Sequence, residues 1–326
     1  MHTQQIEDDN TLLPEPEGWL AWVLGQPVSR GTADDRGCAI NYFEWGDPAD
    51  PPLILLHGFL SHAGCYAAIG PYLAKDHHVI AYDLSGMGDS GTREIYSDET
   101  RVAELMAVAR QTGLFDHARK PVIIAHSYGG NVAIETMQAH HGEFAGVIIC
   151  DLMALRPEHL ARHFSGNRPP GSQDPDRPNK IYPDYETARG RYVLSPKQKV
   201  EEPYLLEYMA YHSMKRVDGG WSWKFDPGVF RRDTTREDRW ERQGPRIVGA
   251  PGRKAVIYGQ RSLLFTDDSA DYLRELGGDD FPIIPVPNAR HHLMLDQPIA
   301  FATALLSVLE MWRAADRAEQ AGQPEQ

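Results

Sequence analysis

The sequence of 326 residues has few cysteines and no excess of positive charge. Its three cysteines, Cys38, Cys65 and Cys150, are odd in number and widely spaced, which argues against a disulfide framework and a cysteine metal site. Acidic residues outnumber basic residues by 46 to 33, which gives a formal net charge of −13. Nucleic acid and anionic membranes attract basic surfaces, so neither is expected as a main partner.

Long apolar runs are missing as well. No stretch of the sequence approaches the roughly 20 apolar residues of a membrane-spanning helix. Residues 1–10 lack the basic and apolar regions of a secretory signal, so we expect a cytoplasmic protein. The glycine-rich residues 83–90 lack both the G-K-[ST] ending of a P-loop and the G-x-G-x-x-G spacing of a dinucleotide site. We expect neither a cofactor nor a metal.

Short apolar runs alternate with amphipathic segments along most of the chain. Continuous apolar runs predict the buried strands of a parallel sheet, and they cover residues 53–56, 79–82, 122–124, 144–150 and 255–258. Further strands are predicted over 38–45 and 281–286, and helices within 15–25 and over 98–112, 268–276 and 298–313. The predicted fold class is α/β, with a mostly parallel central sheet flanked by helices.

The composition changes between residues 153 and 245. Prolines, arginines and aromatic residues cluster there, and helical patterns such as residues 204–211 alternate with loops. We interpret residues 153–245 as a helical cap inserted into a core made of residues 1–152 and 246–326. Residues 1–27 of that core are predicted to be an N-terminal extension with a short helix.

A serine follows the central apolar strand at once. The strand at 122–124 leads into Ala125-His126-Ser127-Tyr128-Gly129-Gly130, and a helical pattern begins directly afterwards. Strand, sharp turn and helix with serine at the apex is the nucleophile elbow, with Ala125 in place of the usual first glycine. The turn exposes the hydroxyl of Ser127 and leaves the N–H of Tyr128 at a helix N-terminus, where it can stabilise an oxyanion.

Other strand ends supply candidate partners for Ser127. His57-Gly58-Phe59 follows the strand at 53–56, and the turn at Gly58 lets the N–H of Phe59 act as a second oxyanion donor. A serine nucleophile also needs a histidine base. His291 and His292 both stand between the last strand and the last helix, and the spacing to Asp296-Gln297-Pro298 favours His291.

These motifs together resemble the α/β-hydrolase fold superfamily. They are His57-Gly58-Phe59, Asp83-x-x-Gly86-x-Gly88-x-Ser90, the elbow around Ser127, and His291 seven residues before Pro298. The resemblance covers roughly residues 35–152 and 250–313 and implies a Ser–acid–His triad. Haloalkane dehalogenases and epoxide hydrolases of this fold use aspartate at the elbow, so Ser127 argues against both.

The resemblance also bears on the acid. Most members carry it in a Gly-x-x-Asp turn after the strand that follows the cap, but this chain reads Gly259-Gln260-Arg261-Ser262 there. Asp267 and Asp268, further on, have the position of N-terminal helix residues. A minority of the superfamily, including some lactonases, places the acid after the strand that follows the nucleophile helix. Asp151 has that position and is the predicted acid.

The predicted activity is that of a cofactor-independent serine hydrolase acting on a carboxylic ester or lactone. The predicted partner is a small apolar or aromatic ester or lactone, with Met153, Trp221, Trp223 and Leu263 as candidate substrate contacts and a homodimer as the assembly to test. Two alternatives use the same fold: hydrolysis of a carbon–carbon bond in a ring-cleavage product, and ligand reception without catalysis.

Overall fold

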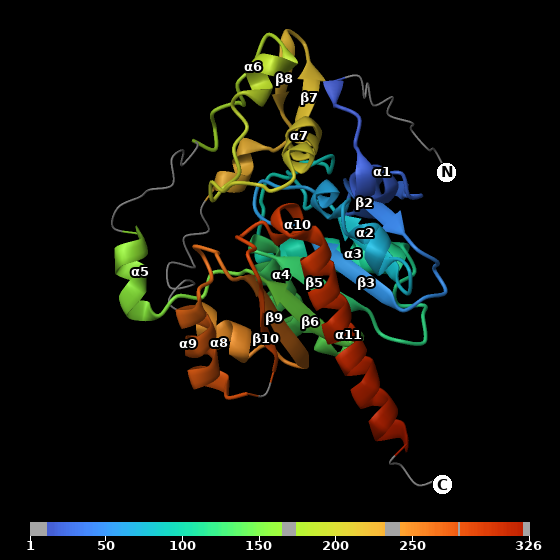
Figure 1. The fold of residues 1–326 in the computed structure, drawn as a ribbon. Coiled ribbons are helices and arrows are strands. Elements are labelled where there is room, and N and C mark those ends of the chain that lie inside the picture. Colours follow the sequence, from blue (N-terminus) through green and yellow to red (C-terminus); the bar gives the residue numbers. More distant parts are fainter. Residues whose placement is uncertain (1–11, 165–173, 232–241, 280, 322–326) are drawn as a thin grey trace.

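The computed structural model describes residues 12–164, 174–231, 242–279 and 281–321, and one eight-stranded sheet forms the centre of that part of the chain (Figure 1). The strand order is β1-β2-β4-β3-β5-β6-β9-β10. The strands are β1 (Ser29–Asp35), β2 (Cys38–Trp45), β3 (Pro52–Leu56), β4 (His78–Tyr82), β5 (Val122–His126), β6 (Gly146–Cys150), β9 (Arg253–Gly259) and β10 (Ile283–Val286).

Six of the eight strands run parallel. β1 pairs with β2 and β2 with β4 in antiparallel fashion, while β4, β3, β5, β6, β9 and β10 form the parallel part. In the register between β5 and β6, His126 pairs with Cys150. The residues that follow these two strands, Ser127 and Asp151, therefore leave the sheet at the same edge.

The parallel strands are apolar on both faces because helices cover both faces. Leu53 and Leu55 of β3 belong to one core cluster, and Ile54 and Leu56 to the other. The helices around the sheet are α1 (Gly18–Leu24), α2 (Gly70–Leu73), α3 (Asp98–Gln111), α4 (Tyr128–His140), α8 (Gln243–Val248), α9 (Asp267–Gly277), α10 (Leu293–Asp296) and α11 (Pro298–Ala321). Residues of α1, α2 and α11 join the first cluster, and residues of α3, α4 and α9 join the second.

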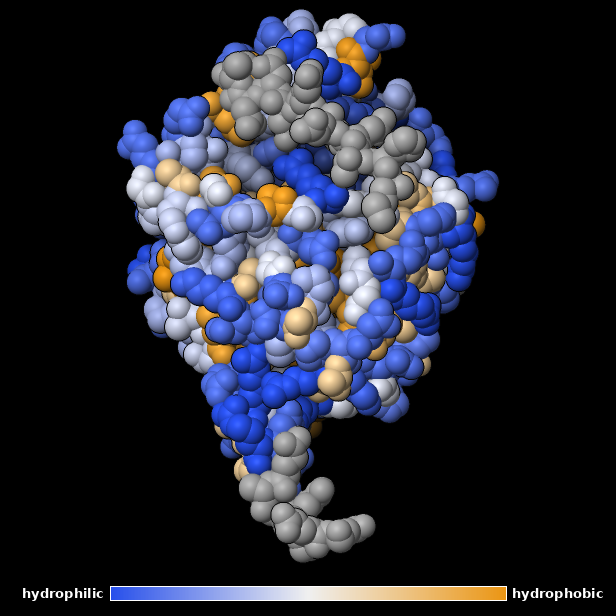
Figure 2. Space-filling model, turned by 90° about the vertical axis from the view of Figure 1, so that its right-hand side faces the viewer, coloured by the Kyte–Doolittle hydropathy of each residue, from blue (hydrophilic) through white to orange (hydrophobic). Residues whose placement is uncertain are grey.

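The last helix, α11, is long and apolar enough to cross a membrane when only its length and composition are considered. Its side chains Phe301, Leu305 and Val308 are buried in the core, which explains its apolar face. The far end of α11 extends beyond the body of the molecule and is covered with hydrophilic side chains (Figure 2).

Residues 153–245, which we call the inserted segment, lie between β6 and β9. Its described elements are α5 (Pro157–Phe164), α6 (Tyr185–Arg189), α7 (Pro203–His212), β7 (Met214–Val217), β8 (Gly220–Trp223) and the short 3₁₀ helix η4 (Pro227–Phe230). α6, α7, β7 and β8 stand together above α10, whereas α5 lies apart from them (Figure 1). Besides its helices, the segment contains the antiparallel pair β7–β8, which was not predicted.

The predicted fold class is confirmed, with differences at particular elements. The helix predicted over 298–313 continues to Ala321. The prediction ended too early because the last turns of the helix are polar and show no amphipathic pattern. The strand β1 was not predicted. Its sequence Ser-Arg-Gly-Thr-Ala-Asp-Asp is polar and mostly exposed at the edge of the sheet, where pairing with β2 rather than burial stabilises it.

The elbow requires a close approach between α4 and β3. A Cβ added at Gly129 would lie 2.8 Å from the carbonyl oxygen of His57 and 2.9 Å from Leu56 Cβ. Alanine at this position would have to push the helix away from the strand.

We predict that Gly129→Ala lowers the free energy of unfolding by about 1–3 kcal/mol, the usual cost of overpacking. At an ordinary helix position the same substitution would raise the free energy of unfolding, since alanine is favoured over glycine there by about 1 kcal/mol. Urea unfolding of the variant measures the change. The control is Gly142→Ala, where an added Cβ meets nothing within 4 Å. Equal unfolding midpoints for the two variants would contradict the close approach.

Candidate active site

Ser127 stands at the apex of the turn between β5 and α4. Its backbone has φ 51° and ψ −121°, outside the regions that most residues with a side chain adopt. Its N–H donates to the carbonyl of Cys150 at 2.8 Å, and its own carbonyl accepts from the N–H of Gly130 at 2.8 Å. Strained backbone of this kind persists only where the surroundings hold it, and it concentrates at functional sites.

The loop after β3 lies directly against this serine. A Cβ added at Gly58 would lie 3.3 Å from Ser127 Cβ. Phe59, the next residue, therefore belongs to the loop that contacts the elbow. Tyr128 opens α4, and the first N–H groups of a helix have no acceptor within the helix. Both predicted oxyanion donors thus come from the segments that meet at Ser127.

A buried histidine shapes the loop of Phe59. The N–H of Leu84 donates to Nε2 of His57 at 3.0 Å, and Nδ1 of His57 donates to the carbonyl of Gly58 at 2.7 Å. Burial lowers the pKa of His57 to about 4, so the ring is neutral at pH 7 and can play both roles. Asp83 adds a second restraint by accepting the N–H of Ala63 at 2.6 Å.

Asp151 and His291 form the central contact of the site. Asp151 follows β6 with φ 49°, and its carboxylate is fully buried. Nδ1 of His291 donates to Asp151 Oδ1 at 2.8 Å, and His291 itself is only 2% exposed. This bond holds the imidazole in the tautomer that leaves Nε2 free to accept a proton.

The same carboxylate accepts two further hydrogen bonds. The N–H of Gly259 donates to Asp151 Oδ2 at 2.7 Å, and the hydroxyl of Ser262 donates to Oδ1 at 2.6 Å. No role had been predicted for Ser262. The sequence nevertheless pointed to this position, because most members of the α/β-hydrolase superfamily carry the acid itself where this chain has Ser262.

The alternative site residues are engaged elsewhere. Asp267 accepts the hydroxyl of Tyr258 at 2.7 Å, and Asp268 pairs with Arg156 at 3.0 Å. Both open α9, as their position in the sequence predicted. His292 is turned differently from His291: its backbone N–H donates to Gln198 at 2.9 Å, and no carboxylate contacts its ring among the described residues.

Two further histidine rings surround His291. The ring of His126 lies 4.7 Å from that of His291, and the ring of His292 lies 4.9 Å from it, between centroids. Burial lowers the pKa of both His126 and His292 well below the ordinary histidine value, so both are neutral at pH 7. One ring nitrogen from each of the three lies within 4.8 Å of the other two, the spacing of a candidate metal-binding group.

Aromatic side chains of the inserted segment reach Phe59 in the loop after β3. The ring of Phe59 lies 5.5 Å from that of Tyr128 and 5.4 Å from that of Phe230, which itself lies 5.9 Å from Phe225. Phe59 remains 39% exposed, as expected of a residue that borders an open surface. The sequence analysis did not single out Phe225 or Phe230 as site residues.

The four residues predicted to contact substrate have different surroundings. Trp221 is buried in the inserted segment, where its ring lies 5.3 Å from Tyr185. Trp223 packs against the same cluster. Met153 is buried in a small apolar cluster beside the end of β6, and Leu263 is 72% exposed. Trp221 therefore stabilises the inserted segment, and the proposed substrate contact of all four stays a prediction.

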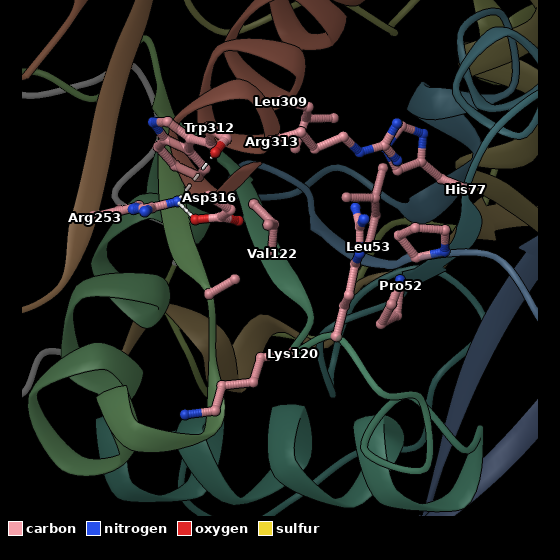
Figure 3. Close-up of a pocket in the computed structure, with 13 residues that line it drawn as sticks. Pro52, Leu53, His77, Lys120, Val122, Arg253, Leu309, Trp312, Arg313 and Asp316 are labelled. Carbon is pink, nitrogen blue, oxygen red and sulfur yellow. Dashed lines mark hydrogen bonds and ion pairs between the residues drawn. The ribbon is translucent and has the colours of Figure 1, made fainter. Parts of the chain in front are cut away.

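A separate cavity of about 210 Å³ opens at the opposite edge of the sheet (Figure 3). Its lining includes Pro52, Val122 and Arg253, which stand at or beside the starts of β3, β5 and β9. Ser127 and Asp151 follow the ends of such strands. This cavity therefore lies across the sheet from the candidate active site and takes no part in it.

Two known proteins resemble about half of this chain in sequence. A serine hydrolase-like protein of Danio rerio is 28% identical over 204 residues, which are 58% of this chain and 57% of that protein. A pyrethroid hydrolase of Sphingobium wenxiniae is 28% identical over 162 residues, which are 48% of this chain and 55% of that protein. The chain thus matches just over half the length of each of these two relatives.

A solved structure and a family comparison agree with these relatives. The thioesterase domain from the curacin biosynthetic pathway superposes with a TM-score of 0.69 over 86% of this chain and 100% of that one, at 18% identity, which shows a common fold. The model of the alpha/beta hydrolase family matches residues 53–304. This match spans most of the sequence and includes the elbow, Asp151 and His291, and the chain belongs to the alpha/beta hydrolase family.

Proposed function

We propose that this hydrolase cleaves a carboxylic ester or a lactone through an acyl-enzyme on Ser127. The observation that carries the proposal is the buried hydrogen bond of 2.8 Å between His291 Nδ1 and Asp151 Oδ1. It sits where Ser127 and Asp151 leave neighbouring strands. A serine hydroxyl becomes a useful nucleophile only when an oriented base takes its proton, and this pair supplies that base.

The proposed reaction has two halves. Ser127 Oγ attacks the carbonyl carbon while His291 Nε2 takes the hydroxyl proton, and the N–H groups of Phe59 and Tyr128 stabilise the oxyanion. The tetrahedral intermediate expels the alcohol, which receives that proton from His291. Water, deprotonated by the same histidine, then attacks the acyl-enzyme and releases the acid. Each oxyanion donor is typically worth about 10²–10³ in rate.

The surroundings of Ser127 favour an apolar substrate. Phe59, Phe225 and Phe230 form a chain of ring contacts that begins at the oxyanion loop. Aromatic surface of this kind stabilises apolar or aromatic acyl and alcohol groups by burial and by ring stacking. The proposed substrate is therefore a small to medium ester or lactone with an apolar or aromatic group.

We predict that the wild-type protein releases p-nitrophenol from short and medium acyl esters and that Ser127→Ala does not. A serine-reactive phosphonate should add one label to the wild type, located at Ser127 by mass spectrometry. Labelling without ester turnover would redirect the search to lactones and to vinylogous diketones, the substrates of carbon–carbon bond hydrolases. Absence of both label and turnover would refute the proposal and favour a ligand receptor.

We predict that Asp151→Asn lowers kcat by about 10⁴, because an amide stabilises the wrong histidine tautomer. Asp267→Asn is the matched control, since this carboxylate also follows β9 but accepts its hydrogen bond from Tyr258. Its kcat should stay within a few-fold of the wild type. Steady-state kinetics on the same ester measures both variants. A large loss in Asp267→Asn together with a small loss in Asp151→Asn would move the acid to the end of β9.

A further inference from the structure

Three histidine rings meet behind the elbow, and the hydrolytic reaction requires only one of them. His126 comes from β5, and His291 and His292 come from the loop before α10. The ring centroids are 4.7 Å apart for His126 and His291, 4.9 Å for His291 and His292, and 5.7 Å for His126 and His292. One nitrogen from each ring lies within 4.8 Å of the other two.

Each ring is oriented through one nitrogen by an oxygen acceptor. Nε2 of His126 donates to the carbonyl of His291 at 2.8 Å, and Nδ1 of His291 donates to Asp151 at 2.8 Å. His292 is held by the backbone carbonyl of Ser195. Metal-ligating histidines are almost always oriented in this way, by a carboxylate or carbonyl that fixes the tautomer and leaves the second nitrogen with its lone pair.

The remaining nitrogen of His292 has an unusual environment. Its Nε2 is shielded from solvent and has no hydrogen-bond partner among the described residues. A buried polar atom left without a hydrogen-bond partner destabilises the folded protein. A metal ion that Nε2 could ligate would supply the missing partner.

We propose that His126, His291 and His292 form an inhibitory site for a transition-metal ion, with Zn²⁺ as the ion that fits. Three neutral imidazoles are a common zinc ligand set, and Zn–N bonds of about 2.0–2.1 Å place the nitrogens roughly 3.4 Å apart. The nitrogens, which lie within 4.8 Å of one another, must approach by up to about 1.4 Å to reach that geometry. The ion acts here as an inhibitor and is not a resident metal of the proposed reaction.

The regulatory consequence rests on the proposed function. Asp151 occupies Nδ1 of His291, so a metal ion can bind this ring only through Nε2. That nitrogen is the one that takes the proton of Ser127 in the proposed reaction. A bound ion therefore removes the base, and hydrolysis stops until the ion leaves or a chelator extracts it.

Metal binding is tested first without any reaction. Ser127→Ala protein, treated with EDTA and dialysed, is titrated with Zn²⁺ by calorimetry and with Co²⁺ by visible absorption. We expect one ion per chain and the intense ligand-field bands of four-coordinate Co²⁺. His292→Phe in the same background should weaken binding by at least about 10–100-fold, because loss of a ligand costs no less than loss of a residue that orients one.

A second histidine serves as the control for burial and ring loss. His212 lies outside the cluster, with its ring 4.2 Å from that of Tyr208. His212→Phe in the Ser127→Ala background should retain the Zn²⁺ affinity of the parent protein. Equal weakening by His212→Phe and His292→Phe would show an effect on folding rather than on ligation and would overturn the site.

Inhibition is measured separately on protein that retains Ser127. For each protein, the rate of ester turnover with Zn²⁺ is divided by the rate of the same protein without the ion. EDTA should restore the turnover that Zn²⁺ inhibits. The Zn²⁺ concentration for half inhibition should rise at least about tenfold in His292→Phe. Turnover that Zn²⁺ does not affect, or affects equally in both proteins, overturns the inhibitory site and leaves the proposed function intact. If the protein binds the metal ion but hydrolyses no ester or lactone, the metal site stands and the proposed function is overturned.

Discussion

The buried contact between Asp151 and His291 sets the arrangement of the whole site. The two residues are 140 positions apart in the chain, and neither is more than 2% exposed. A buried carboxylate without partners would cost several kcal/mol. The donors that prevent this come from His291, Gly259 and Ser262, so the loop after β9 and the loop before α10 must both close on the end of β6.

The inserted segment is bound to the core by polar contacts next to the site. Lys224 pairs with Asp89 at 2.6 Å, and the N–H of Asp226 donates to the carbonyl of Gly86 at 2.8 Å. These bonds tie the stretch before η4 to the loop after β4. The ring contact of Phe230 with Phe59 follows from that attachment, because only a few residues separate Phe230 from the two anchors.

The strands of the parallel sheet could be predicted because their apolar runs reflect burial on both faces, which is a local property of the sequence. The elements missed had no such pattern. β1 is a polar edge strand, and β7–β8 is a two-stranded pair within the inserted segment, where Trp221 and Trp223 suggested only apolar surface. Pairing partners rather than side-chain periodicity define these strands, and partners are not visible in a short window of sequence.

The elbow was predictable from a short window of sequence, because a strand, small residues and a helix must follow one another locally to display Ser127. Spacing favoured His291 over the adjacent His292, and a resemblance supplied Asp151. Tertiary structure decided which histidine meets the carboxylate and assigned Ser262 as its donor. These contacts depend on how separate loops close over one sheet edge, and no local periodicity encodes a distance between residues more than 100 positions apart.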